Sequence, residues 1–190
     1  MKNYIITLFI LGCSLTAFAQ DKAALQTALD RFYKNTTAGQ YEALLADTYP
    51  KIFEVIPKEQ MLKKLQEMLN GPGYVLDVLD APANFEFGEI KHVGKGYYCI
   101  VKHDMLMKMT FTEPIGEAES KEMIQQFKKS MKTDVVSFNQ KTNSFTMKIR
   151  ADVIAISNTV TGGTWKFLNR TGPNIMNKVL DEDVRKALGL

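Results

Sequence analysis

The sequence predicts a single α+β domain in which N-terminal helices pack on a strongly curved, mostly antiparallel sheet. Apolar residues recur every three or four positions from Lys22 to Leu69, whereas from Tyr74 to Asn169 they mostly alternate with polar ones. Helices followed by a run of long strands are typical of α+β domains. Two later stretches return to helical spacing, which predicts an extra helix inserted between strands at 117–132 and a C-terminal helix at 173–188.

Three helices are expected before the sheet. The first covers 22–38 and stops near Gly39, and a shorter one covers 40–47. Pro57 opens the third, because proline is favoured in the first turn of a helix. The sequence Asn70-Gly71-Pro72-Gly73 ends it.

The strands that follow are expected to be long. Almost every odd position of 97–112 is apolar, which predicts that one face of this strand is buried. The glycines around it place His92 in a turn, and Asp181 is an expected cap inside the C-terminal helix. The expected strands lie at 74–78, 84–90, 97–112, 134–140, 144–157 and 164–169.

The N-terminus reads as a signal peptide over 1–19, with a charged start, a short apolar run and an Ala17-Phe18-Ala19 cleavage site. The apolar run has about half of the roughly 20 residues that a membrane-spanning helix needs, so no stable membrane insertion is expected. Residues 21–190 form the predicted mature domain, exported to the periplasm or the extracellular space. Lipoprotein anchoring through Cys13 is the alternative.

Charge and motifs exclude several classes of function. The formal net charge of +3 is small and evenly spread, so no nucleic-acid partner is expected. Cys99 is the only cysteine after the leader, which rules out an internal disulfide in the mature chain. The sequence has no glycine-rich phosphate loop, no Gly-x-Ser-x-Gly and no zinc-type cluster, so no cofactor and no metal are expected.

The order of two helices, Tyr49-Pro50, a third helix and long strands ending in Thr164-Trp165-Lys166-Phe167 resembles the nuclear transport factor 2-like superfamily. The resemblance covers about 22–169 and implies a cystatin-like, cone-shaped fold with a pocket between sheet and helices. In that superfamily, isomerases, dehydratases, hydrolases and cyclases place an Asp, His or Tyr inside the cone, whereas other members only bind or associate. The helix at 117–132 is an insertion that a minimal member would lack.

His103 is the best catalytic candidate, because strand parity places it on the apolar face, where an imidazole could act as a general base. Tyr97 is the candidate proton donor. Asp104 points to the opposite face, so His103 and Asp104 are not a facing dyad. Asp152 shares the polar face of its strand and is expected to lie opposite a cation. A structural, hydrogen-bonded His103 is the competing interpretation.

Aromatic and thioether side chains predict an apolar ligand pocket in the cone, although core packing would use the same residues. The first hypothesis is a non-enzymatic binding domain for a small apolar ligand or a protein partner. An isomerase- or hydrolase-type enzyme with a His base is the alternative, and a structural homodimer formed through the open sheet is the third. The expected pocket residues are Tyr33, Tyr49, Phe53, Met105, Met107 and Trp165.

Overall fold

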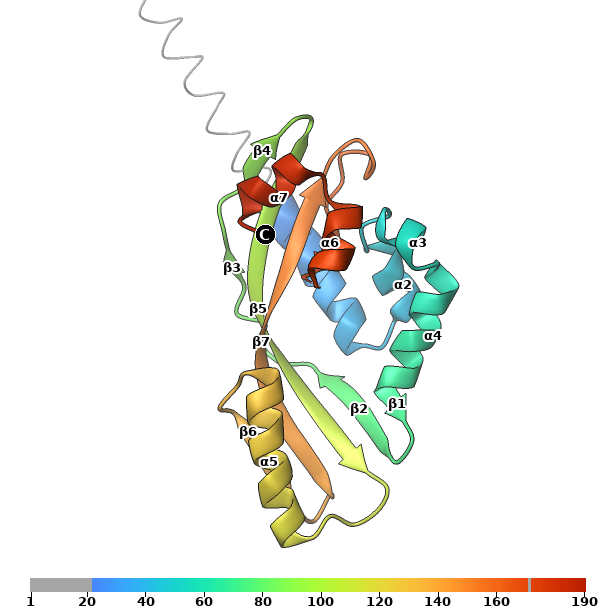
Figure 1. Ribbon diagram of the computed structural model, residues 1–190, viewed down its shortest axis with the longest axis vertical. Coiled ribbons are helices and arrows are strands. Elements are labelled where there is room, and N and C mark those ends of the chain that lie inside the picture. Colours follow the sequence, from blue (N-terminus) through green and yellow to red (C-terminus); the bar gives the residue numbers. More distant parts are fainter. Residues whose placement is uncertain (1–21, 171) are drawn as a thin grey trace, which may run out of the picture.

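The computed structural model describes residues 22–170 and 172–190, so the predicted signal peptide 1–19 and Cys13 lie outside the described residues. The described chain is an α+β structure with helices around one antiparallel sheet of eight strands (Figure 1). The first helix covers 22–37. The others are α2 Tyr41–Ala46, α3 Ile52–Val55, α4 Lys58–Leu69, α5 Glu117–Met131, α6 Pro173–Val179 and α7 Glu182–Leu188.

The long strands lie where they are expected, apart from the stretch between residues 84 and 96. The short elements α3 and β1 were not expected, and the C-terminal helix differs from the expectation. The predicted strand 84–90 is reduced to β3, and at its expected start Asn84 adopts a left-handed rather than an extended conformation, with φ of 46°. His92 lies in strand β4 rather than in a turn. The C-terminal helix is divided in two, with Asp181 at the N-cap of α7. The strands are β1 Asn70–Gly71, β2 Tyr74–Leu79, β3 Glu86–Phe87, β4 Lys91–Val93, β5 Gly96–Phe111, β6 Val136–Asn139, β7 Ser144–Ser157 and β8 Lys166–Asn169.

The sheet is built around the long antiparallel pair of β5 and β7, which runs from Tyr97 opposite Ser157 to Thr110 opposite Ser144. The upper half in Figure 1 adds β4, β3 and β8 to this pair. The lower half adds β2 and β6. The two half-sheets therefore share only two strands.

Between the halves the sheet narrows to a two-stranded waist. On β5, β3 pairs no further than Lys102 and β2 pairs no further than Leu106. On β7, β6 ends opposite Met147 and β8 ends opposite Val153. We call the stretch between these positions, where His103 lies opposite Ala151, the waist.

In the upper half, helices cover both faces of the sheet. Helix 22–37 places apolar residues at helical spacing against one face, and Leu25, Leu29 and Phe32 pack on odd-numbered strand residues such as Cys99. Gly39, with φ of 66°, allows the chain to turn after this helix. The other face carries even-numbered residues, which α6 and α7 cover. Its buried residues Tyr98, Ile154 and Ile156 form one core cluster with Met176, Val179 and Val184 of these two helices.

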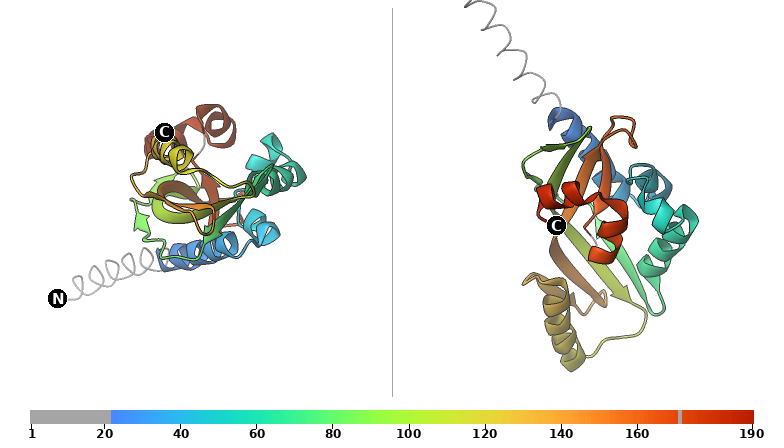
Figure 2. Two further views of the ribbon diagram at one scale, coloured as in Figure 1. Left: turned by 90° about the horizontal axis from the view of Figure 1, so that it is seen from below. Right: turned by 45° about the horizontal axis from the view of Figure 1, so that its top comes forward.

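In the lower half, α5 packs on the odd-numbered face through Phe127, whose ring lies 5.1 Å from that of Phe145. Even so, α5 lies on the same side of the molecule as α6 and α7, with helix 22–37 on the opposite side (Figure 2). The face that points back in the upper half therefore points forward in the lower half. Strong twist is expected where a sheet is only two strands wide.

No helix among the described residues has the length and apolar character needed to cross a membrane.

Candidate functional site

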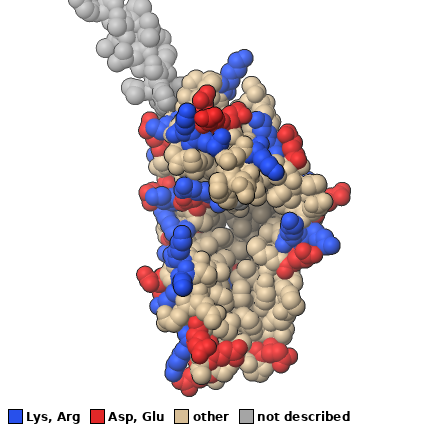
Figure 3. Space-filling model, in the orientation of Figure 1, with Lys and Arg blue, Asp and Glu red and all other residues tan. Residues whose placement is uncertain are grey.

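A cleft of about 500 Å³ lies beside the waist, between the end of helix 22–37, α2, α4 and the sheet. Figure 3 shows a hollow near the middle of this side of the molecule, bordered mainly by uncharged surface. We call it the waist cleft. Its volume is in the range of small-molecule sites, which is about 300–1,000 Å³.

One end of the waist cleft is apolar. Here α4 and β2 face the second half of β5, with Val78 paired to Met107 across the strands. The side chain of Met68 is 52% exposed at the rim. The apolar lining residues at this end are Leu65, Met68, Leu69, Leu76, Val78, Met105 and Met107.

His103 lines the middle of the cleft and is 7% exposed. The rings of Tyr33 and Phe85 pack against it, with centroids 5.9 and 6.1 Å away. Burial lowers the pKa of the imidazole, so the neutral form is favoured. Nδ1 lies 3.4 Å from the backbone oxygen of Asp104. A carbonyl oxygen can only accept, so this contact favours a proton on Nδ1 and leaves Nε2 as an acceptor.

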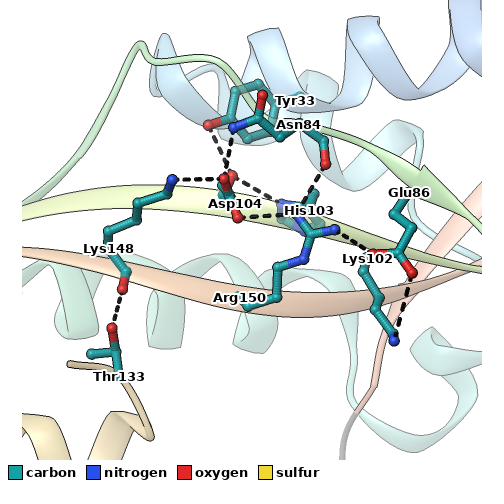
Figure 4. Close-up of polar contacts among 9 residues, drawn as sticks. All are labelled: Tyr33, Asn84, Glu86, Lys102, His103, Asp104, Thr133, Lys148 and Arg150. Carbon is teal, nitrogen blue, oxygen red and sulfur yellow. Dashed lines mark hydrogen bonds and ion pairs between the residues drawn. The ribbon is translucent and has the colours of Figure 1, made fainter. Parts of the chain in front are cut away.

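Asp104 is the centre of a polar network at the waist (Figure 4). Its carboxylate accepts hydrogen bonds from Asn84 at 2.7 Å and Arg150 at 3.0 Å, and it pairs with Lys148 at 2.8 Å. The hydrogen bonds from Asn84 and Lys148, with a further one from Arg150, hold the pKa of this carboxyl well below its usual range. The network supplies side-chain links where β5 and β7 lack neighbouring strands.

The same network fixes the segment that carries Phe85. Arg150 donates to the backbone oxygen of Asn84 and to the carboxylate of Glu86, both at 2.9 Å. The backbone N–H of Asp104 donates to the carbonyl of Ala83. These bonds hold Phe85 in place over His103.

The other end of the waist cleft is polar and lies at the outer edge of β7. Arg170 follows β8, and its Nη1 donates to Asp152 Oδ2 at 2.9 Å. The side chains of Arg170 and Asp152 are 44% and 23% exposed. Asp152 thus faces a cation, as the sequence predicts. Thr36, Tyr41 and Asn169 also line the cleft.

The predicted site residues fall into three groups. Tyr33, His103, Met105 and Met107 come together in the waist cleft. Tyr97 and Trp165 line a second cleft of about 730 Å³ between helix 22–37 and the loop after β7, which we call the loop cleft. Tyr49 and Phe53 pack instead with the core under α6 and α7.

The structure does not bring His103 and Tyr97 together. They lie six residues apart on one strand, a separation of about 20 Å at roughly 3.3 Å per residue. The hydroxyl close to His103 is that of Tyr33, which donates to the backbone oxygen of Asp104 at 3.3 Å. Burial is the main cause that raises the pKa of Tyr33, so its proton is retained.

Residues 22–170 and 172–190 contain no reactive cysteine site and no grouped metal ligands. Cys99 is fully buried, and burial raises the pKa of its thiol to about 11. In this part of the chain, no three His, Cys, Asp or Glu side chains are grouped to hold a metal ion.

Sequence reasoning missed Arg170 and the α4 and β2 residues of the cleft. The α4 residues stand out in sequence only as the apolar face of a helix, which core packing explains equally well. No protein-family model matches the chain, and a search of curated proteins found no match.

Proposed function

We propose that this protein is an exported, non-enzymatic binding protein that takes a small ligand with a large apolar part in the waist cleft. The observation that carries the proposal is a cleft of about 500 Å³ with one wholly apolar end, in a chain whose N-terminus reads as a signal peptide. Three methionines at that end give it an adaptable surface.

Binding is favoured over catalysis by the surroundings of His103. A general base needs a second polar group positioned to act with it on the substrate. The His103 ring has one hydrogen bond among the described residues, to a backbone oxygen, and the carboxylate of Asp104 is occupied by Asn84, Lys148 and Arg150. The nearby hydroxyl of Tyr33 donates to the backbone oxygen of Asp104. The imidazole therefore has no hydrogen-bonded side-chain partner among the described residues.

The nuclear transport factor 2-like resemblance supports the same proposal. Helices packed on a large antiparallel sheet, with a cleft between the two, are the arrangement that the resemblance implies. On this proposal the waist cleft corresponds to the pocket of the cone, and α5 is an addition outside it.

The test is binding of Nile red, a neutral apolar dye whose fluorescence rises in apolar surroundings. The purified protein is expected to bind it, and Val78→Trp is expected to block binding by filling the apolar end of the cleft. Val135→Trp is the matched control, because Val135 is 58% exposed and does not line the cleft. Equal binding by the two variants would place the dye elsewhere and remove the support for this function.

A further inference from the structure

We propose that the ligand of the waist cleft is an amphipathic anion, with an apolar body and one terminal carboxylate. This inference rests on the proposed function, because it names the ligand class for the same cleft. It follows from the separation of apolar and polar lining residues and from the bonding of the two arginines in the cleft.

The apolar and polar ends of the cleft lie on opposite edges of the sheet. At the apolar end, β2 pairs with β5, and at the polar end, β8 pairs with β7. Because β2 and β8 flank β5 and β7 on opposite edges and pair with different stretches of them, the two ends are separated both across the sheet and along its strands. A ligand that fills the cleft therefore needs an apolar body at one end and a polar group at the other.

The two arginines of the cleft differ in how many of their N–H groups are used. Arg150 donates to Asn84, Asp104 and Glu86. Arg170 has one side-chain hydrogen bond among the described residues, to Asp152. A guanidinium has five N–H donors and can hold a carboxylate through two parallel bonds. Of the two arginines, Arg170 is therefore the one with donors left to bind an anion.

The groups at the polar end of the cleft also favour a carboxylate over an ammonium head group. An ammonium group would lie beside the positive charge of Arg170 and a carboxylate beside the negative charge of Asp152, but the remaining N–H donors of Arg170 favour the carboxylate. With its proton on Nδ1, His103 offers a carboxylate no donor from Nε2, whereas Arg170 has donors. The guanidinium of Arg170 is within reach of a head group, because its side chain is 44% exposed.

The test compares three probes with the same ten-carbon chain: decanoate, decan-1-ol and decylamine. Binding is measured by isothermal titration calorimetry at pH 7.5, where decanoate is charged. Decanoate is expected to bind most tightly. Arg170→Gln is expected to weaken decanoate by about fivefold or more and to leave decan-1-ol unchanged, because only the anion uses the guanidinium. Lys95→Gln removes one positive charge from the loop cleft and is expected to change none of the three.

Two further measurements keep the test decisive. Asp152→Asn frees the guanidinium of Arg170 and is expected to strengthen decanoate binding. With ¹³C-methyl-labelled methionine, decanoate is expected to shift the signals of Met68, Met105 and Met107, which line the apolar end. Unchanged methionine signals on decanoate binding would overturn the proposed location.

The outcomes separate the two proposals. Decan-1-ol or decylamine binding as tightly as decanoate, or decanoate binding that Arg170→Gln leaves intact, would overturn the anion and leave the cleft as an apolar site. Failure of Nile red and all three probes to bind would overturn the proposed function itself.

Discussion

Replacing Phe145 by alanine tests the packing of the lower half of the molecule. The side chain is fully buried, and its ring lies 4.6 Å from that of Phe138, 5.1 Å from Phe127 and 5.8 Å from Phe111. A buried Phe→Ala change costs about 3–5 kcal/mol, because apolar contacts are lost and a cavity remains. Since the total free energy of unfolding is about 5–15 kcal/mol, Phe145→Ala is expected to remove a large share of it.

The assay is urea unfolding followed by far-ultraviolet circular dichroism. The midpoint for Phe145→Ala is expected to fall by more than 1 M, since the slope for small proteins is about 1–3 kcal/mol per molar urea. Val135→Ala, at an exposed position, is the control and is expected to stay within about 0.5 kcal/mol of the wild type. A loss of less than about 1 kcal/mol at Phe145 would refute the packing of α5 on this face of the sheet.

Two pH-dependent predictions follow from the waist. The pKa of Asp104 is lowered in the folded protein, so the stability that its carboxylate contributes is present above its ordinary pKa of 3.8 and is lost as the pH falls below it. Asp104→Asn is expected to show a smaller fall in urea midpoint between pH 5 and pH 3 than the wild type, and an equal fall would contradict the network. The pKa of His103 is also lowered, so its imidazole signal in nuclear magnetic resonance is expected to titrate with a midpoint below 6.5 and the protein to lose stability as the pH falls below that value. A midpoint at or above 6.5 would mean that His103 is not held neutral.

The long elements were predictable from the sequence because they are amphipathic with a clear period, whereas the short helix α3 and the two-residue strand β1 were not predicted. The alternation in β5 and the spacing of three and four in helix 22–37 both follow from burial of one face, and the structure has both. The segment at 84–90 misled the same reasoning. Its alternating Phe85 and Phe87 resemble a strand, but only Glu86 and Phe87 pair with β5. Asn84, at the start of the segment, instead donates to the Asp104 carboxylate and accepts from Arg150.

The site was harder to predict, because the same residue types line a pocket and fill a core. Tyr33 and Tyr49 are both tyrosines near helix ends, yet only Tyr33 lines the waist cleft. Strand parity correctly gives Tyr97 and His103 one face, but it does not show that different helices cover that face along its length. Arg170 follows the last strand, where the sequence has no motif or periodicity that marks a site. Its place in the cleft is seen only in the structure.

The two-stranded waist has a consequence for how binding and shape are linked. The waist cleft is lined by α4 and β2 of the lower half and by the end of β8 in the upper half, while only β5 and β7 join these halves within the sheet. Any rotation of one half against the other about this joint changes the distance between the two ends of the cleft. By thermodynamic linkage, a ligand long enough to contact both ends therefore selects one angle between the halves and restrains torsion about the joint.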